Sequence, residues 1–316
     1  MLTVRNDSMV TALTYTDRTG YEPAFLKPGK LDGRVFLPTL SKQLERDATR
    51  LVADAKAYVL RYHRYSAVMH RSRRFAIYSA ANVDYSGRFV MPRPKDRWLF
   101  DPRIPIEGQV GAALYENNQL DRGHLTRRED MEFGKTRAEA LARAADTNHW
   151  TNCTPQHARF NGSRQLWQGI ERHILENAID PDQFRAQVIT GPVFDAKDPV
   201  LSGFPDSPYP LRYWKVVAAI DASGKLFATA YVLDQRGVID QYGLRGAPEI
   251  PFKPYKTFQT TIAEVERLTK LTFTGSRGAK RVSLGEFDPL ARRPRTRGAG
   301  HDVYVKLGTV SSIVVE

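Results

Sequence analysis

Four consecutive residues combine an acid, a cation and a base in one short run. Asp121, Arg122, Gly123 and His124 bring these groups together. A near-neutral imidazole can remove a proton from water at pH 7, and a guanidinium can stabilise the charge that develops on a phosphate. The run therefore predicts phosphodiester hydrolysis with His124 as the general base, although four such residues also occur on the surfaces of unrelated proteins.

Amide side chains form a second cluster further along the chain. Asn152 begins the run Asn-Cys-Thr-Pro-Gln, and Asn161 precedes a periodic apolar stretch. Amide oxygens suit a hard cation such as Mg²⁺, which keeps most of its waters and takes one or two protein oxygens. Asn161 is therefore a candidate metal ligand and, equally, a candidate N-cap of the helix that follows.

These motifs occur in an order that resembles a known family, the DNA/RNA non-specific endonucleases. They are the ββα-metal nucleases that include endonuclease G. The resembling segments are Asp-Arg-Gly-His at 121–124, Thr-Asn-Cys-Thr-Pro-Gln at 151–156, Phe-Asn-Gly with a later Trp and Glu at 160–171, Thr-Gly-Pro at 190–192, Tyr-Trp-Lys at 213–215 and a final helix at 261–266. Several motifs in one order are a far more specific signal than any one of them.

The resemblance implies a role for individual residues. His124 would be the general base, and Arg122 would contact the phosphate or stabilise the transition state. Asn161 would be the sole direct protein ligand of Mg²⁺, and Glu171 would hold one of the metal's waters. Asn152 would orient the site near His124.

A second catalytic arginine is also implied by the resemblance. The segment Asp-Arg-Trp-Leu-Phe-Asp-Pro makes Arg97 the candidate, with Arg93 and Arg103 as competitors. Four further residues are candidates for binding substrate around His124: they are Arg127, Arg128, Asp121 and Gln156.

The spacing between Asn161 and Glu171 departs from the family pattern, because this chain has two more residues between them. At about 100° per residue, two extra positions inside a helix would rotate Glu171 away from the metal. We therefore expect the insertion in the loop before the helix, near residues 162–164. Glu176 is the alternative holder of the metal's water.

Composition limits the class of protein. The 316 residues carry a formal net charge of +12, which favours a polyanionic partner. The single cysteine, Cys153, excludes an intrachain disulfide and with it a disulfide-stapled secreted scaffold. The chain has no apolar run typical of a signal peptide or a membrane span, so we expect a cytoplasmic protein without a membrane partner.

Hydrophobic periodicity and turn residues predict the elements that position these groups. Leu166, Ile170 and Ile174, for example, repeat every four residues, as on one face of a helix. We expect irregular chain over 1–38 and 86–118, helices over 39–53, 136–145, 162–179 and 260–268, strands over 65–69, 75–80, 186–189, 213–220 and 226–233, a loop or linker over 274–300, and an edge strand within 303–315.

This order of elements is not a regular alternation of strand and helix, so it predicts an α+β chain with largely antiparallel pairing. The resemblance adds a ββα-metal nuclease core on the central sheet, flanked by helices. We expect three parts: an N-terminal arm and helix (1–55), the nuclease domain (56–275) and a basic C-terminal tail (276–316).

The function that follows is a Mg²⁺-dependent, sequence-non-specific endonuclease for DNA and RNA, with Mn²⁺ as an expected substitute. The alternatives are a non-catalytic nucleic-acid-binding protein with a degenerate site and a phosphodiesterase for small nucleotides. Such a nuclease is toxic in a cytosol, so we expect restraint by residues 1–50 or by an inhibitory or regulatory protein, as in bacterial defence or toxin systems. The resemblance also favours a homodimer.

Overall fold

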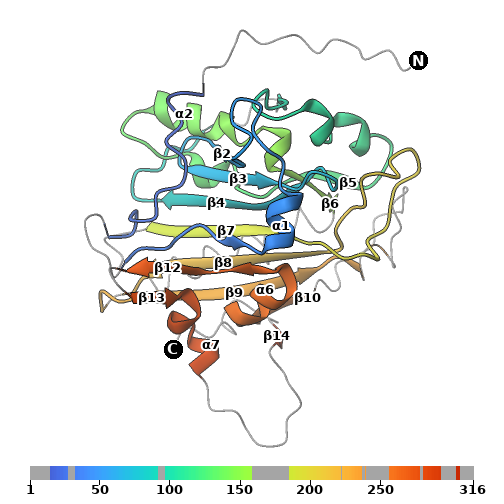
Figure 1. Cartoon of the computed structure of the whole chain (residues 1–316). Coiled ribbons are helices and arrows are strands. Elements are labelled where there is room, and N and C mark those ends of the chain that lie inside the picture. Colours follow the sequence, from blue (N-terminus) through green and yellow to red (C-terminus); the bar gives the residue numbers. More distant parts are fainter. Residues whose placement is uncertain are drawn as a thin grey trace, which may run out of the picture.

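The computed structural model describes residues 15–27, 33–91, 97–158, 185–221, 223–236, 239, 256–277, 280–292 and 304–306. Its centre is an antiparallel 8-stranded sheet in the order β14-β10-β9-β8-β7-β4-β3-β2 (Figure 1). The strands are β2 (Val59–Arg61), β3 (Tyr65–Met69), β4 (Ala76–Asp84), β7 (Arg185–Val193), β8 (Arg212–Ile220), β9 (Leu226–Asp234), β10 (Lys256–Thr260) and β14 (Tyr304–Lys306).

Shorter elements surround this sheet. Among the described residues, three pairs of strands lie outside it: β1 (Thr39–Leu40) with β11 (Leu271–Thr272), β5 (Leu120–His124) with β6 (Cys153–His157), and β12 (Thr274–Arg277) with β13 (Lys280–Ser283). The α-helices are α1 (Lys42–Asp47), α2 (Arg137–Asp146), α6 (Ile262–Thr269) and α7 (Pro289–Arg292). The 3₁₀ turns are η1 (Ile106–Gly108), η2 (Ala112–Tyr115), η3 (Glu129–Met131), η4 (Trp150–Asn152) and η5 (Leu284–Phe287).

The central strands separate two hydrophobic cores. On β8, Tyr213 points to the side that holds Leu125, from the segment after β5, whereas Trp214 points to the side that holds Ile262 of α6. Because both faces are covered, β8 is apolar along most of its length instead of alternating. In Figure 1, α2, β5 and β6 lie beside the β2–β4 half, and α6, α7, β12 and β13 lie beside the β8–β10 half.

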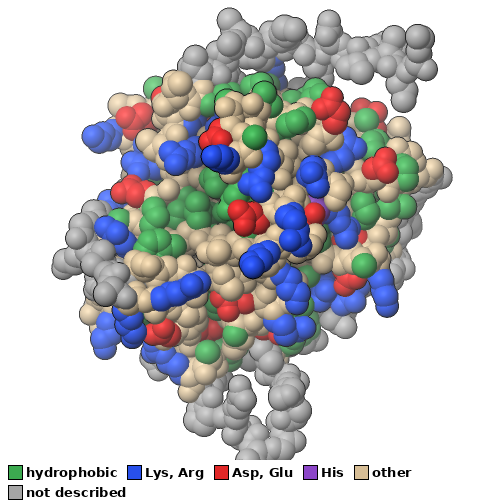
Figure 2. Space-filling model, viewed as in Figure 1, with side chains coloured by type: hydrophobic (Ala, Val, Ile, Leu, Met, Phe, Trp, Pro, Cys, Tyr) green, Lys and Arg blue, Asp and Glu red, His purple; other side chains and the backbone are tan. Residues whose placement is uncertain are grey.

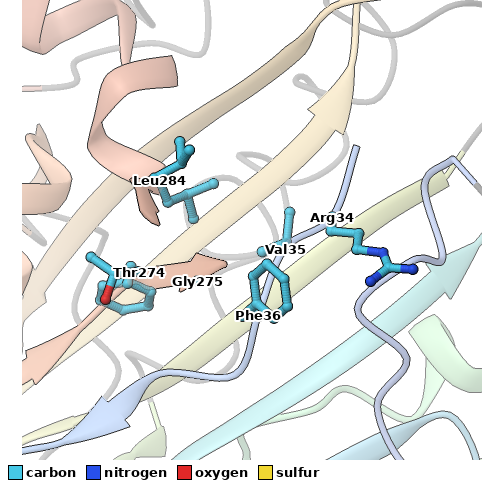
Figure 3. Close-up of a pocket in the computed structure, with 8 residues that line it drawn as sticks. Arg34, Val35, Phe36, Thr274, Gly275 and Leu284 are labelled. Atoms are coloured by element: carbon cyan, nitrogen blue, oxygen red, sulfur yellow. The ribbon is translucent and has the colours of Figure 1, made fainter. Parts of the chain in front are cut away.

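The N-terminal segment and the β12–β13 hairpin close over one face together. Val35 and Leu284 belong to the same buried cluster. Phe36 packs so closely on Gly275 that a Cβ at Gly275 would overlap its ring. Figure 3 shows these side chains around a small gap, which Arg34 and Thr274 also line. Segments far apart in sequence therefore complete the core on this side.

Most expected elements are present. The hairpin is β3–β4, the helix over 136–145 is α2, the three later strands are β7, β8 and β9, and the helix over 260–268 is α6. The C-terminal edge strand is β14, which pairs with β10. The irregular chain over 86–118 contains only η1 and η2 among its described residues. The helix expected over 162–179 lies outside the described residues.

Two expectations are wrong. The helix over 39–53 is reduced to α1, because Ser41 caps it and residues 39–40 instead pair with β11. The loop expected over 274–300 contains the β12–β13 hairpin, η5 and α7 through Arg292. Burial of Phe273 and Leu284 and a capping box between Ser283 and Glu286 order this basic segment. Within the described ranges, every helix is too short or too polar to span a bilayer.

Replacing Gly191 with alanine should destabilise the central sheet. Gly191 lies opposite Trp214 in the β7–β8 pair, and a Cβ there would overlap the carbonyl oxygen of Ile77. Backbone cannot yield as a flexible side chain can, so Gly191→Ala should cost about 2–3 kcal/mol. Urea unfolding measures this loss. Gly87→Ala is the control, since its nearest neighbour would be 3.5 Å away; equal midpoints for the two variants would contradict the packing argument.

Candidate active site

A two-stranded antiparallel ribbon carries the central candidate residues. In the β5–β6 register, His124 pairs with Cys153 and Asp121 pairs with Gln156. Because side chains alternate along a strand, Arg122 and His124 share one face of the ribbon, whereas Asp121 and Gln156 point to the other. The structure thus brings the expected base and the expected phosphate-binding arginine together and separates them from two other candidates.

Gly123 lies between Arg122 and His124 for a packing reason. A Cβ at Gly123 would overlap the side chain of Gln156, whose amide crosses the ribbon at this point. The φ angle of Gly123 is not in the left-handed region. The glycine is therefore required by the close approach of Gln156 and not by an unusual backbone conformation.

The contacts of His124 include a polar and an aromatic neighbour. Its Nε2 lies 2.9 Å from Oδ1 of Asn148, and its ring centroid lies 4.6 Å from that of Trp98, at an angle of 43°. Asn148 is buried, while His124 is partly exposed. The imidazole is consequently fixed in orientation and still reachable from solvent.

Asn152 fixes the chain on both sides of the site. Its fully buried amide accepts a hydrogen bond from Thr126 N (2.9 Å) and donates to Thr126 O (2.8 Å) and Thr147 O (2.9 Å). Its backbone oxygen also accepts from Leu125 N (3.0 Å). The side chain therefore joins the residues that follow His124 to the end of α2; the orienting role expected from the sequence stays a prediction.

Arg122 is exposed at the edge of an aromatic cluster. Its guanidinium carbon lies 5.8 Å from the ring centroid of Trp150, a cation–π distance. Trp150 is buried and stacks on Trp98, with centroids 5.2 Å apart. The guanidinium of Arg122 thus packs on the buried ring of Trp150 and remains accessible to an anion.

The residues that follow Arg97 pair with the segment that contacts His124. Leu99 forms a parallel bridge with His149, with hydrogen bonds of 2.9 Å from Leu99 N to Asn148 O and from Trp150 N to Leu99 O. This pairing holds the chain from Arg97 onward beside the loop that contacts His124. Arg97 itself is exposed.

The two competing arginines differ from Arg97. Arg103 forms a two-pronged ion pair with the buried carboxylate of Asp101, at 3.0 and 2.7 Å. Its guanidinium also lies 4.0 Å from the ring centroid of Tyr15. Arg103 is therefore committed to the fold, while Arg93 lies outside the described residues.

The two arginines after His124 are also engaged in ion pairs. Arg127 pairs with Glu129 and, at 3.3 Å, with Asp130. Arg128 has only 7% of its side chain exposed and pairs with Glu132. Arg128 thus stabilises the η3 turn, and the predicted contacts of both arginines with a substrate stay predictions.

Residues 45–277 match the sequence family described as DNA/RNA non-specific endonuclease. The chain belongs to this family. A curated relative, the uncharacterized protein y4fB of Sinorhizobium fredii (strain NBRC 101917 / NGR234), is 34% identical over 270 residues. The match covers 82% of this chain and 39% of that protein, so the chain spans well under half of its relative's length.

The fold also resembles that of EndoG, a ββα-metal nuclease. The crystal structure of EndoG in complex with EndoGI superposes on this chain with a TM-score of 0.51 and 19% identity. The superposition covers 68% of this chain and 85% of that chain. It confirms the fold class expected from the sequence, a ββα-metal nuclease with a large antiparallel sheet.

Members of this family generally depend on a divalent metal. The direct ligand expected from the sequence, Asn161, lies outside the described residues, as do Glu171 and Glu176. In the described part of the chain, no three His, Cys, Asp or Glu side chains converge on a point where they could hold a metal ion. The amide oxygen Oε1 of Gln156 is buried without a hydrogen-bond partner, but it lies on the face of the ribbon opposite His124. The expected donors, an Asn amide and a Glu carboxylate, are oxygen ligands of the kind that fit a hard, largely hydrated cation.

Sequence reasoning missed Asn148 and the network behind it. Tyr15 donates a hydrogen bond of 2.8 Å to Nε2 of His149, whose Nδ1 lies 2.7 Å from Asp146 O. Arg18 binds both carboxylate oxygens of Asp146, at 3.2 and 3.0 Å. Asn148 lies inside an otherwise ordinary Thr-Asn-His-Trp run, and its spacing of four from Asn152 is the only signal that marked it.

Acid should weaken this network through Asp146. Burial raises the pKa of this carboxyl, but hydrogen bonds from His63 and Arg18 outweigh burial and hold the pKa below its usual value. A depressed pKa contributes stability that is present above about pH 4 and is lost as the pH falls through the folded-state value. Asp146→Asn should therefore cost about 3 kcal/mol at pH 7.

Thermal unfolding between pH 7 and pH 3 tests the role of Asp146. The wild type should lose stability towards pH 3 more steeply than Asp146→Asn, because the variant has already lost the charged contact. Asp206→Asn is the control, since Asp206 is exposed. Parallel pH curves for wild type and Asp146→Asn would contradict this assignment.

Proposed function

We propose that this chain is a divalent-metal-dependent, sequence-non-specific endonuclease that hydrolyses phosphodiester bonds of DNA and RNA. The observation that carries the proposal is the shared face of Arg122 and His124 on the β5–β6 ribbon of a DNA/RNA non-specific endonuclease family member. A formal net charge of +12 favours a polyanionic substrate. Lys and Arg side chains are spread over the face seen in Figure 2, with acidic side chains among them.

His124 would act as the general base. A neutral imidazole that donates its Nε2 proton to the Asn148 oxygen carries its lone pair on Nδ1. Nδ1 would take a proton from water while the water oxygen bonds to phosphorus. The bond from phosphorus to the 3′ oxygen would break, that oxygen would take a proton from solvent, and the product would carry a 5′-phosphate. The Asn148 oxygen and the Trp98 ring both favour the imidazolium that results.

Arg122 would bind the phosphate beside His124. Its exposed guanidinium can form paired hydrogen bonds with phosphate oxygens. Arg97 would add a second positive charge, and Asn152 would position His124 through the chain that follows it. Arg128, in its buried ion pair, is a weaker candidate for substrate binding.

Asn161 would hold Mg²⁺, with Glu171 or Glu176 holding one of its waters. When bound, the metal would neutralise charge on the phosphate oxygens. Mn²⁺ is expected to substitute for Mg²⁺. Binding through phosphates and not bases predicts little sequence preference.

An inhibitory protein partner is part of the proposal. EndoG has been solved in complex with EndoGI, in a structure that concerns the mechanism of EndoG inhibition. An unrestrained non-specific nuclease damages its own cell, so a similar restraint is expected here. The homodimer, the cytoplasmic location and the role in defence or as a toxin effector stay predictions from the sequence.

Plasmid and RNA digestion tests the proposed activity. Wild-type protein with Mg²⁺ should cut both substrates, and EDTA should stop cleavage. His124→Ala should slow cleavage by about a thousandfold, within the usual contribution of a general base. His70→Ala is the control, because His70 is a partly buried histidine that packs on Phe194 and is not among the candidate site residues. Intact plasmid and RNA with the wild type would leave a non-catalytic nucleic-acid-binding protein as the better interpretation.

Arg122→Ala should weaken both binding and cleavage. Loss of one phosphate contact should reduce the slope of log affinity against log salt concentration by about one, and kcat should fall by about a hundredfold. Duplex binding and single-turnover cleavage at several salt concentrations measure the two effects. Arg46→Ala on α1 removes an exposed arginine outside the site and serves as the control. An unchanged salt slope in Arg122→Ala would move the phosphate contact elsewhere.

A further inference from the structure

Aromatic side chains form a continuous cluster next to the proposed reacting groups. The ring of Trp150 contacts Trp98, Phe100 and Tyr115, with centroid distances of 5.2, 6.0 and 5.9 Å. Trp98 in turn contacts His124 at 4.6 Å. Successive ring contacts therefore lead from the imidazole to Phe100.

Two members of the cluster come from one extended segment. Leu99 is paired with His149, so the residues on either side of it, Trp98 and Phe100, point to the same side. Both lie against Trp150. The tip of the Phe100 ring rests on Gly111, where a Cβ would be only 2.5 Å away. The backbone therefore fixes both rings before any ligand binds.

Phe100 is the solvent-exposed member at one end of this aromatic cluster. It is 39% exposed, whereas Trp150 is 4% exposed. A single exposed phenylalanine is ordinary on a protein surface. Here, however, the exposed ring is continuous with a histidine and an exposed arginine that suit a phosphate. Aromatic rings beside cationic groups are the features that bind unpaired nucleotides, because every base has a π-face and every nucleotide carries a phosphate.

We propose that Phe100, supported by Trp98 and Trp150, stacks an unpaired nucleobase next to the phosphate bound at Arg122 and His124. This inference rests on the proposed function and names its substrate class: single-stranded or locally unpaired nucleic acid. The bases of a duplex already stack on one another, so a duplex must unstack before it can use Phe100. Any base can occupy the ring, so the preference concerns strandedness and not sequence.

The test compares ligands with the same phosphates but different bases. The full chain, in EDTA to prevent cleavage, is titrated with a single-stranded oligothymidylate, with an abasic oligomer of equal length and with a duplex of equal length. Stacking on one ring contributes a factor of about five to a hundred in affinity. Wild-type protein should therefore bind the oligothymidylate about tenfold more tightly than the abasic oligomer.

Three variants separate stacking from packing. Phe100→Leu keeps an apolar side chain against Gly111 but has no π-face, so the affinity gap should shrink to about twofold. Phe100→Trp should restore the gap. Leu141→Ala, on α2, removes an apolar side chain of similar exposure (49%) and should leave it unchanged. Thermal unfolding of each variant confirms that the fold is kept.

The outcomes distinguish this inference from the proposed function. Equal wild-type affinity for oligothymidylate and abasic oligomer, no binding of either, or a gap that survives Phe100→Leu would each overturn the stacking site. Those results leave the Mg²⁺-dependent cleavage assay unaffected. Conversely, a base-dependent gap in a protein that cuts neither plasmid nor RNA would support the stacking site and reject the endonuclease.

Discussion

The buried amide of Asn152 is the constraint on which the rest of the site depends. It binds the backbone of Thr126 and Thr147 at the same time, so one side chain sets the distance between the end of β5 and the end of α2. Asn148, which holds His124, lies on the short stretch between Thr147 and Asn152. An amide that satisfies three backbone groups in a buried position cannot be exchanged for an apolar residue without leaving those groups unpaired. The orientation of His124 therefore depends on the hydrogen bonds of Asn152, because they fix the stretch of chain that carries Asn148.

The central sheet is the second support of the ribbon. Ser79 on β4 hydrogen-bonds to Thr126 at 2.7 Å, and Tyr213 on β8 donates to Pro155 O at 2.5 Å. Gln235 also donates to Pro155 O, at 3.3 Å. These contacts come from β4, from β8 and from the residue after β9, and the other residues of these strands build the two cores. The central sheet therefore holds the β5–β6 ribbon in place. The position of the site on a rigid scaffold suits chemistry that depends on fixed groups.

Local patterns in the sequence predicted much of this arrangement. The hairpin, the long strands and α2 follow from periodicity and propensity, which short segments carry by themselves. The ordered motifs marked His124, Arg122 and Asn152, because these residues lie within short runs. The contact of Asn148 with His124 and that of Phe100 with Trp150 were missed, since both depend on a bridge between Leu99 and the segment that follows α2, a pairing between residues far apart in the chain. The β12–β13 hairpin was missed for a similar reason, because basic residues obscured the burial that orders it.

Residues of the N-terminal segment contribute to the support of the candidate site. Tyr15 and Arg18 precede the part of the chain that matches the family, yet they bind His149 and Asp146 behind the site. Their contacts lie on the supporting side of the loop that carries Asn148, and not across Arg122 and His124. Because these contacts join the segment to the loop that holds His124, its described residues are part of the fold that supports the candidate site. Restraint, whether by residues 1–50 or by an inhibitory or regulatory protein, stays a prediction from the sequence.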